Sequence, residues 1–290
     1  MSLDRLAGAP ISWGVCEVPG WGHQMAPERV LAEMASAGLV ATEFGPEGFL
    51  PEAPQDKVAL LASHGLVAVG GFVPVVLHDP TRDVLAAITP MLSAFGTAGA
   101  DTLVLAADTG RTGYDERVVL DEAQWQTLLA NLDRISEAAA EHGILATLHP
   151  HVGTIIEREP EVARVLDSSA IALCLDTGHL LIGGNDPVRL AREVPDRIAH
   201  THLKDVNADL ARSVQKGQMS YSAAVKAGMY RPLGTGDVDI AGIVSALEAN
   251  GYSGWYVLEQ DTVLGAEPAT DAGPIEDVLA SLAFVAELAK

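Results

Sequence analysis

The sequence predicts a (β/α)8 barrel of the α/β class, formed by a single domain over residues 1–290. Strand-like and helix-like segments alternate from end to end, which is typical of a parallel sheet with helical crossovers. The 290 residues match one barrel, which commonly takes about 250 residues, plus insertions. Four apolar segments in the second half also close on a His, Asp or Glu, as expected where polar groups gather at the carboxyl ends of barrel strands.

Eight segments have the composition of buried parallel strands, because each is a short apolar run bounded by turn residues. Eight such units in this length favour closure into a barrel over an open, doubly wound sheet. The predicted strands are Ala9–Trp13, Ala41–Phe44, Leu66–Phe72, Thr102–Ala106, Leu145–His149, Ile171–Asp176, Ile198–His202 and Trp255–Glu259.

Helices are predicted between these strands, where apolar residues recur at helical spacing and a glycine commonly follows the last turn. Acidic residues at the start of the long central helix agree with the helix dipole. The predicted helices are Pro27–Ala37, Glu52–His64, Thr81–Ala98, Asp121–His142, Glu159–Asp167, Pro187–Val194, Ile240–Asn250 and Ile275–Ala289.

One connection, residues 205–239, is much longer than the others. We expect it to contain two short helices, around Ala208–Gln215 and Ser220–Ala227, and to arch over the barrel mouth. Connections of this length are usually functional. The GTGD sequence at residues 234–237 lacks the spacing of a dinucleotide-binding loop, so we interpret it as a turn that enters the helix at Ile240.

The composition of the chain indicates which kinds of binding partner and which cellular compartment to expect. The net charge of −21, from 18 basic and 39 acidic residues, argues against nucleic acid as a partner. No apolar run approaches the roughly 20 residues of a membrane span, and the first ten residues lack the apolar core of a signal peptide. Two distant cysteines, Cys16 and Cys174, do not suggest a disulfide framework. We expect a cytoplasmic protein, with a homo-oligomer left open.

His149, Asp176, His202 and Glu259 close four of the predicted strands and are the candidate metal ligands. Any one of them taken alone would more often be a helix cap, a turn residue or a surface acid. A single barrel, however, places its strand ends around one axis, so the four together predict one divalent ion. Imidazole and carboxylate donors suit Mn²⁺ or Co²⁺, with Mg²⁺, Fe²⁺ or Zn²⁺ as alternatives.

Other polar residues close to these ligands are candidates for catalysis and substrate binding. His151 and Lys204 each stand two residues beyond a ligand, and residues at i and i+2 of a strand share a face. His or Lys can transfer protons near neutral pH. The candidate catalytic residues are Glu43, His151, His179 and Lys204, and the candidate substrate contacts are Trp13, Glu157 and Arg231.

The ligand order resembles the metal set of the xylose-isomerase-like barrels, the sugar-phosphate isomerase and epimerase superfamily. Six spans resemble more particularly the myo-inosose-2 dehydratases within it, and the resemblance covers nearly the whole chain. The DTGH and HLKD motifs are more specific for the superfamily than for the dehydratases. These spans are Ala9–Gly14, Ala41–Phe49, His149–Glu157, Leu175–Leu180, His200–Val206 and Tyr230–Asp239.

One position departs from the superfamily pattern, because His149 stands where most members have Glu. A His there also resembles the dehydratases. It leaves the fourth metal ligand open, since His149, His151, Glu157 or water could supply it.

The resemblance implies metal-dependent dehydration of a polyhydroxylated cyclic ketone, such as 2-keto-myo-inositol, through an enolate to a diketone in inositol catabolism. A ketose isomerase or 3-epimerase, which uses the same metal and enolate without losing water, is the first alternative. A non-catalytic barrel that binds a sugar is the second. A metal-dependent DNA-repair nuclease is disfavoured by the charge and by too few ligands for three ions.

Overall fold

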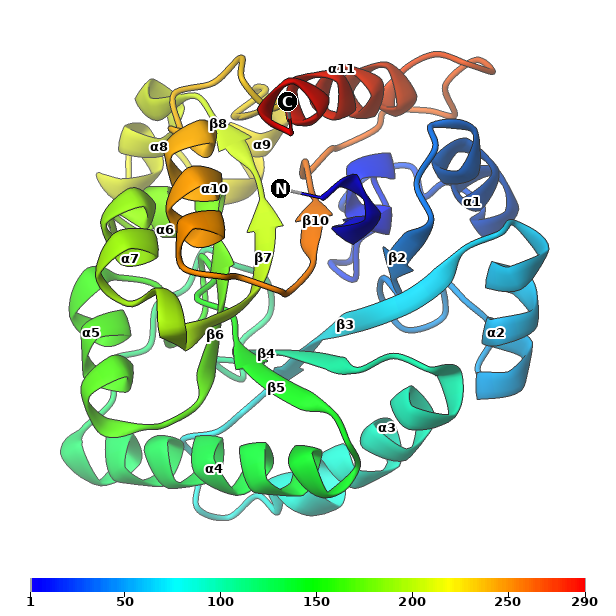
Figure 1. The fold of residues 1–290 in the computed structure, drawn as a ribbon. Helices are drawn as coiled ribbons and strands as arrows, with labels where there is room; N and C mark the ends of the chain where they lie inside the picture. Colours follow the sequence, from blue (N-terminus) through cyan, green and yellow to red (C-terminus); the bar gives the residue numbers. More distant parts are fainter. Residues whose placement is uncertain (1, 290) are drawn as a thin grey trace.

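The computed structural model describes residues 2–289 and contains ten strands, eight of which form a closed barrel (Figure 1). Every neighbouring pair in this barrel is parallel. The barrel strands are β1 (Leu6–Gly8), β2 (Ala41–Glu43), β3 (Val67–Val75), β4 (Thr102–Ala107), β5 (Leu145–Leu148), β6 (Ala172–Asp176), β7 (Ile198–Leu203) and β10 (Tyr256–Leu258). Their order is β1-β10-β7-β6-β5-β4-β3-β2, so the prediction of a (β/α)8 barrel is confirmed.

Helices surround this barrel in Figure 1, and most have the bounds that the sequence predicts to within a few residues. Their starts follow local capping rules: the Asp121 side chain accepts from the Gln124 backbone N–H at the start of α4, and Asp83 caps α3 in the same way. The helices are α1 (Pro27–Ser36), α2 (Pro54–Ser63), α3 (Val84–Ala98), α4 (Glu122–Glu141), α5 (Glu159–Ser168), α6 (Thr177–Ile182), α7 (Pro187–Glu193), α8 (Ala208–Gln215), α9 (Tyr221–Lys226), α10 (Ile240–Ala249) and α11 (Pro274–Leu288).

The first predicted strand, Ala9–Trp13, is wrong. The strand is Leu6–Gly8, and Pro10–Trp13 forms a 3-10 helix instead. Proline has no N–H for a strand ladder and a fixed φ that suits the first position of a helix. The third strand also differs, because β3 continues three residues beyond Phe72 to Val75.

The barrel interior changes from apolar to polar along its axis. Small side chains from β2, β3, β10, β1 and the residue that follows β1 form a separate cluster inside the barrel, which consists of Ala7, Ala9, Ala41, Val69 and Val257. The larger core lies between the strands and the helices. The carboxyl ends of β5, β6 and β7 instead carry buried polar residues, among them His149, Asp176 and His202. This is the end of a barrel where active sites are found.

The long connection after β7 contains α8 and α9 and a small antiparallel sheet, in which β8 (Asp205–Val206) pairs with β9 (Tyr230–Arg231). The buried Asp205 carboxylate holds it in place by accepting four backbone N–H groups, from Val206, Gly234, Gly236 and Val238, at 2.9–3.0 Å. The GTGD segment is therefore a turn around this carboxylate, and α10 begins at Ile240 as predicted.

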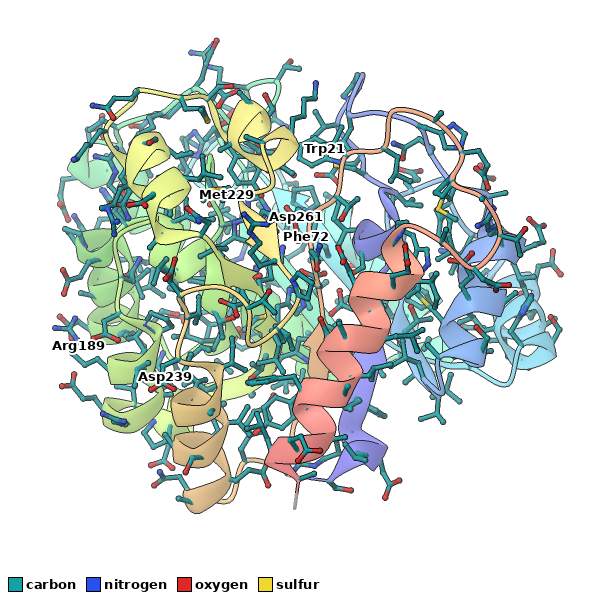
Figure 2. The ribbon with its side chains drawn as sticks, turned by 90° about the horizontal axis from the view of Figure 1, so that it is seen from above. Trp21, Phe72, Arg189, Met229, Asp239 and Asp261 are labelled. Carbon is teal, nitrogen blue, oxygen red and sulfur yellow. The ribbon has the colours of Figure 1, made fainter. Side chains whose placement is uncertain are left out.

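Seen from above, the connection lies at the same end of the barrel as Asp261 and Trp21 (Figure 2). The Trp21 ring, from the loop before α1, lies 6.4 Å from the ring of Tyr221 on α9. Among residues 2–289, no helix is both long and apolar enough to cross a membrane.

We expect Asp205→Asn to destabilise the protein, because it places an amide NH₂ group against backbone N–H donors that now share a carboxylate. Hydrogen bonds to a charged acceptor contribute about 1.5–3 kcal/mol each, so the free energy of unfolding should fall by about 3 kcal/mol. Urea denaturation followed by circular dichroism measures it. The exposed Asp196→Asn is the matched control, and equal midpoints for both variants would refute the anchoring role of Asp205.

Candidate active site

Two neighbouring strands set the depth of the polar residues inside the barrel. Asp176 at the end of β6 is in register with His202 on β7, and Cys174 is in register with His200 one layer below. Residues two apart on a strand share a face, so both layers point into the barrel. His149 follows the last residue of the adjacent strand, β5. All five side chains are almost completely buried.

Asp176 uses its two carboxylate oxygens for different purposes. Oδ1 accepts from the backbone N–H of His179 at 2.7 Å and so caps α6. Oδ2 lies 3.1 Å from Nε2 of His149 and 3.6 Å from Nδ1 of His202. Burial raises the pKa of Asp176, but the Lys204 ammonium and His179 outweigh it and hold that pKa well below its usual value. The carboxylate is therefore ionised and aimed at two imidazoles.

His202 is held between carboxylates on both sides of its ring. Nε2 lies 2.9 Å from Oε1 of Glu43, which also contacts Nε2 of His200 at 2.8 Å. Nδ1 lies 3.0 Å from Oε2 of Glu259. A proton on Nε2, donated to Glu43, leaves the Nδ1 lone pair free, which is the arrangement that fixes histidine ligands in metal sites.

The donor set fits a divalent cation. The Nδ1 atoms of His149 and His202 are buried and, within residues 2–289, have no hydrogen bond of acceptable geometry. The contacts of His149 and Asp176, and of His202 with Asp176 and Glu259, measure 3.0–3.6 Å between donor atoms. Ligands bound about 2.0–2.2 Å from one ion have similar mutual spacings. Asp176, His202 and Glu259 thus offer ligand atoms within 4.8 Å of one another, and His149 adjoins them through its contact with Asp176.

Lys204 is buried beside these ligand atoms and is charged. Its Nζ donates to Oδ1 of Asp261 at 2.6 Å and lies 3.0 Å from Oε2 of Glu259 and 3.6 Å from Oδ2 of Asp176. Burial lowers the pKa of Lys204, but Asp261, Glu259 and Asp176 together raise it well above its usual value. Burial likewise raises the pKa of Glu259, and His202 and Lys204 reverse that effect and lower it. Acidic groups therefore outnumber the lysine, which favours a further cation.

His151 and His179 form a stacked, neutral pair next to the ligands. Their ring centroids are 3.7 Å apart, and burial lowers both pKa values well below the usual value for histidine. Nδ1 of His151 lies 2.6 Å from the carbonyl oxygen of Val152, so this nitrogen carries the proton and Nε2 can accept one. Nε2 of His179 lies 3.0 Å from Nζ of Lys204.

Each residue of the DTGH motif, residues 176–179, has a separate task. Asp176 caps α6 and faces the ligands. The Thr177 hydroxyl donates to the Lys204 carbonyl at 2.6 Å and accepts from the Lys204 N–H at 2.8 Å, which fixes the end of β7. A Cβ at Gly178 would lie 2.7 Å from the Cβ of Lys204. His179 then enters the stacked pair.

A cavity of about 710 Å³ opens beside these groups. Pockets of this size hold small-molecule ligands. Aromatic rings form part of its wall: the ring centroids of Tyr114 and Phe72 lie 4.6 and 5.5 Å from that of His151, in tilted arrangements. Phe72 and Asp261, both labelled in Figure 2, line this cavity. The polar residues that line the cavity are Glu43, His149, His151, His202, Lys204, Glu259 and Asp261, among others.

Three predicted substrate contacts do not lie at this cavity. Trp13 is buried in the core behind the barrel wall, where its indole N–H donates to Glu33 at 2.8 Å, because the chain turns at Pro10. The Glu157 carboxylate accepts from the Gly153 N–H at 3.0 Å and pairs with Arg117. Arg231 is exposed on β9.

Sequence reasoning did not assign Asp261, Tyr221, His200 or Tyr114, although all four contact site residues. Tyr221 donates to Oδ2 of Asp261 at 2.6 Å and thereby links the long connection to Lys204. Two of these residues could have been predicted from strand periodicity, because Asp261 stands two positions after Glu259 and His200 stands two before His202. Tyr114 and Tyr221 lie in connections where no periodicity marks them.

Residues 31–285 match the sequence model of the family described as xylose isomerase-like TIM barrel, and the chain belongs to this family. The chain is 31% identical over 297 aligned positions to an inosose dehydratase of Geobacillus thermodenitrificans, covering 98% of this chain and 96% of that protein. The predicted resemblance to the inosose dehydratases, and with it the prediction of an enzyme, is confirmed.

Solved structures share the fold at low sequence identity. An L-ribulose 3-epimerase superimposes with a TM-score of 0.70 at 16% identity, over 98% of this chain and 94% of its own. An IOLI protein with a bound zinc atom superimposes with a TM-score of 0.69 at 14% identity, over 98% and 97%. At these identities the likeness shows the fold alone.

We expect Gly178→Ala to strain the contact between α6 and β7, because the new methyl group would lie within 2.7 Å of the Lys204 Cβ. Overpacking of this kind commonly costs about 1–3 kcal/mol. Gly96→Ala is the matched control: Gly96 is exposed inside α3 with open space around it, so the change should stabilise by about 0.5–1 kcal/mol. Thermal unfolding checks both variants, and a Gly178→Ala melting temperature at or above the wild-type value would contradict the close approach.

Proposed function

We propose that this chain is a metal-dependent hydro-lyase that removes water from a polyhydroxylated cyclohexanone, such as 2-keto-myo-inositol, to give a diketone. One observation carries the proposal: the donors of Asp176, His202 and Glu259 converge, with His149 against Asp176, beside a buried ammonium and a neutral imidazole that line a cavity. The inosose dehydratase names of several relatives support the substrate class.

The ligands in this proposal are His149 through Nε2, Asp176 through Oδ2, His202 through Nδ1 and Glu259 through Oε2. A divalent ion bound there supplies Lewis-acid chemistry, which polarises the ketone and a neighbouring hydroxyl and stabilises the enolate of the substrate. Mn²⁺ or Co²⁺ remains our proposal for the metal, because the donors are mixed imidazole and carboxylate. Glu43 contacts Nε2 of His202, the ring nitrogen that does not face the other candidate ligands, and we assign Glu43 the role of orienting this imidazole.

His151 is the proposed general base. It lines the cavity, is neutral, and has its Nδ1 proton committed to the Val152 carbonyl, so Nε2 accepts the proton from the carbon next to the ketone. The contacts with His179 and Tyr114 fix the plane of its ring. The proton abstracted by His151 leaves the electron pair of the C–H bond in the enolate.

Lys204 is the proposed general acid. Its ammonium lines the cavity and is oriented by Asp261 and His179. As the β-carbon–oxygen bond breaks, the leaving hydroxyl takes a proton from Lys204 and departs as water. The enol that remains tautomerises to the diketone. Tyr221 keeps Asp261 in place, so the long connection contributes to the position of the acid.

A ketose isomerase or 3-epimerase is the second candidate, and the donor set itself favours it, because a metal-stabilised enolate serves both reactions. Such enzymes also need a group on the opposite side of the substrate to return the proton. Mass spectrometry of the product separates the two: loss of one water indicates dehydration, whereas an isomer of unchanged mass indicates the alternative. No turnover with any divalent metal would favour the non-catalytic sugar-binding barrel.

Removal of metal should abolish dehydration, and Glu259→Gln should weaken metal binding by more than roughly tenfold, because even outer-shell partners contribute that much to metal affinity. Elemental analysis of purified protein and diketone absorbance with 2-keto-myo-inositol measure the two effects. Glu193→Gln is the matched control, since that side chain is 65% exposed on α7. Full metal content together with full turnover in Glu259→Gln would refute the metal site.

His151→Gln should lower kcat by about 10²–10⁴-fold, the usual contribution of a general base, while metal content stays at the wild-type level. His142→Gln, at an exposed position after α4, is the matched control and should keep full activity. Exchange of the substrate proton next to the ketone with deuterium from D₂O, followed by NMR, needs the base but not the acid. A variant that lacks the base should therefore lose this exchange. Unchanged exchange in His151→Gln would assign the base to another residue.

A further inference from the structure

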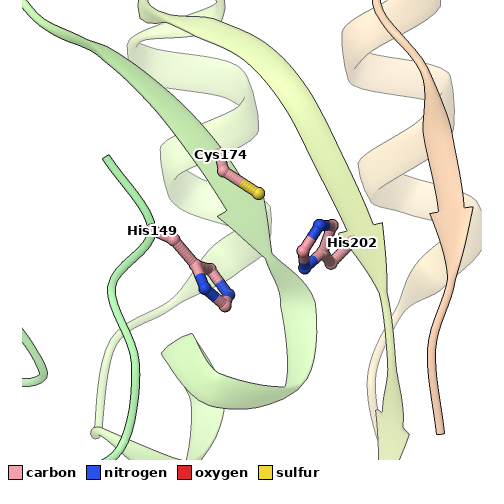
Figure 3. Close-up of side chains that lie close together, drawn as sticks. All are labelled: His149, Cys174 and His202. Atoms are coloured by element: carbon pink, nitrogen blue, oxygen red, sulfur yellow. The ribbon is translucent and has the colours of Figure 1, made fainter. Parts of the chain in front are cut away.

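Directly below the strand-end ligands lies the thiol of Cys174, which the proposed reaction does not use. Figure 3 shows this side chain on β6, with the imidazoles of His149 and His202 facing the space next to its sulfur. The ligand atoms of these three residues all lie within 4.8 Å of one another. Cys174 is completely buried, so no solvent separates them.

The position of Cys174 follows from the barrel register. It stands two residues before Asp176 on the same face of β6, and it pairs with His200 in the layer beneath the strand ends. The sulfur therefore points along the same axis as the carboxylate, one layer deeper. A cation that moves down by this layer exchanges carboxylate oxygen for sulfur while keeping the same two imidazoles.

A second observation points to a ligand at this depth. Within the described part of the chain, Nδ1 of His149 is buried without a hydrogen bond, and Nδ1 of His202 has carboxylate contacts at 3.0 and 3.6 Å but none of hydrogen-bond geometry. Buried polar atoms in native proteins are normally paired, so an unpaired imidazole nitrogen needs an explanation such as a bound ion. The two imidazoles and the thiol together offer two nitrogen donors and one sulfur donor.

We propose that His149, Cys174 and His202 form a second, softer metal position that selects Zn²⁺ over Mn²⁺ and overlaps the strand-end site through its two imidazoles. Thiolate and imidazole donors favour Zn²⁺, whereas carboxylate and water favour Mn²⁺. Three protein ligands leave one position of a tetrahedral zinc ion for water or substrate. On binding, the S–H bond of Cys174 breaks, its electron pair forms the bond to zinc, and the displaced proton leaves to bulk water by way of the adjacent cavity.

Because the two positions share His149 and His202, they exclude each other. One equivalent of Zn²⁺ at the deeper position withholds both imidazoles from the ion that Asp176 and Glu259 hold above. Zn²⁺ should therefore displace a single equivalent of Mn²⁺ rather than add to it. This inference concerns metal selection and holds whether the enzyme dehydrates or epimerises its substrate.

Cobalt is the probe that reports the sulfur donor, because thiolate bound to Co²⁺ gives a near-ultraviolet charge-transfer band that oxygen and nitrogen donors do not. Metal-free full-length protein titrated with Co²⁺ should show this band. Cys16→Ser, which removes the other cysteine, should keep it, and Cys174→Ser should lose it. A wild-type protein without the band, or a band that survives in Cys174→Ser, would overturn the proposal.

Metal affinities give an independent readout, measured by chelator competition for Zn²⁺ and by the magnetic resonance signal of free Mn²⁺. Cys174→Ser should weaken Zn²⁺ binding by at least roughly tenfold, because the loss of an outer-shell partner alone has an effect of that size. Mn²⁺ binding should stay unchanged. Equal changes for both ions would refute selection by Cys174. Should the Ser variant fold poorly, Cys174→Ala and the wild-type cobalt spectrum still decide the question.

Discussion

The divided hydrogen bonding of the Asp176 carboxylate is the constraint on which the site depends. One oxygen ends β6 and begins α6, and the other faces the two imidazoles. The helix cap thereby fixes the orientation of the Asp176 carboxylate, a candidate metal ligand, and restricts its rotation. Thr177 and Gly178 fix the position of the end of β7, because they hold the Lys204 backbone against α6. Four consecutive residues thus set the geometry of two strands.

Electrostatics explains why these groups tolerate burial. Asp176, Glu259 and Asp261 surround the single ammonium of Lys204, while Glu43 is matched to His200 and His202. Removing one partner from such a cluster would leave an uncompensated charge, which is far more costly than the net value of the pair. The same negative surplus that keeps Lys204 protonated also favours a divalent cation among the strand-end donors.

The fold was predictable from sequence, and the candidate ligands could be named from it, because both rest on short-range periodicity. Apolar runs that end on His149, Asp176, His202 and Glu259 identify strand ends, and barrel closure brings them together. Trp13 was misplaced because Pro10 stops the first strand early and turns the indole into the core. Tyr114 reaches the cavity wall and Tyr221 reaches Asp261 from connections, where position depends on tertiary contacts that no local pattern encodes.

The anchor of the long connection has a mechanical consequence. Asp205, which holds that connection by four backbone N–H groups, stands only three residues after His202 on the same stretch of chain. The long connection and the imidazole of His202, a candidate metal ligand, therefore form one stiff unit. Any motion that opens the cavity without displacing His202 has to come from the other side of the entrance, where the segment around Trp21 meets Tyr221 through ring contact.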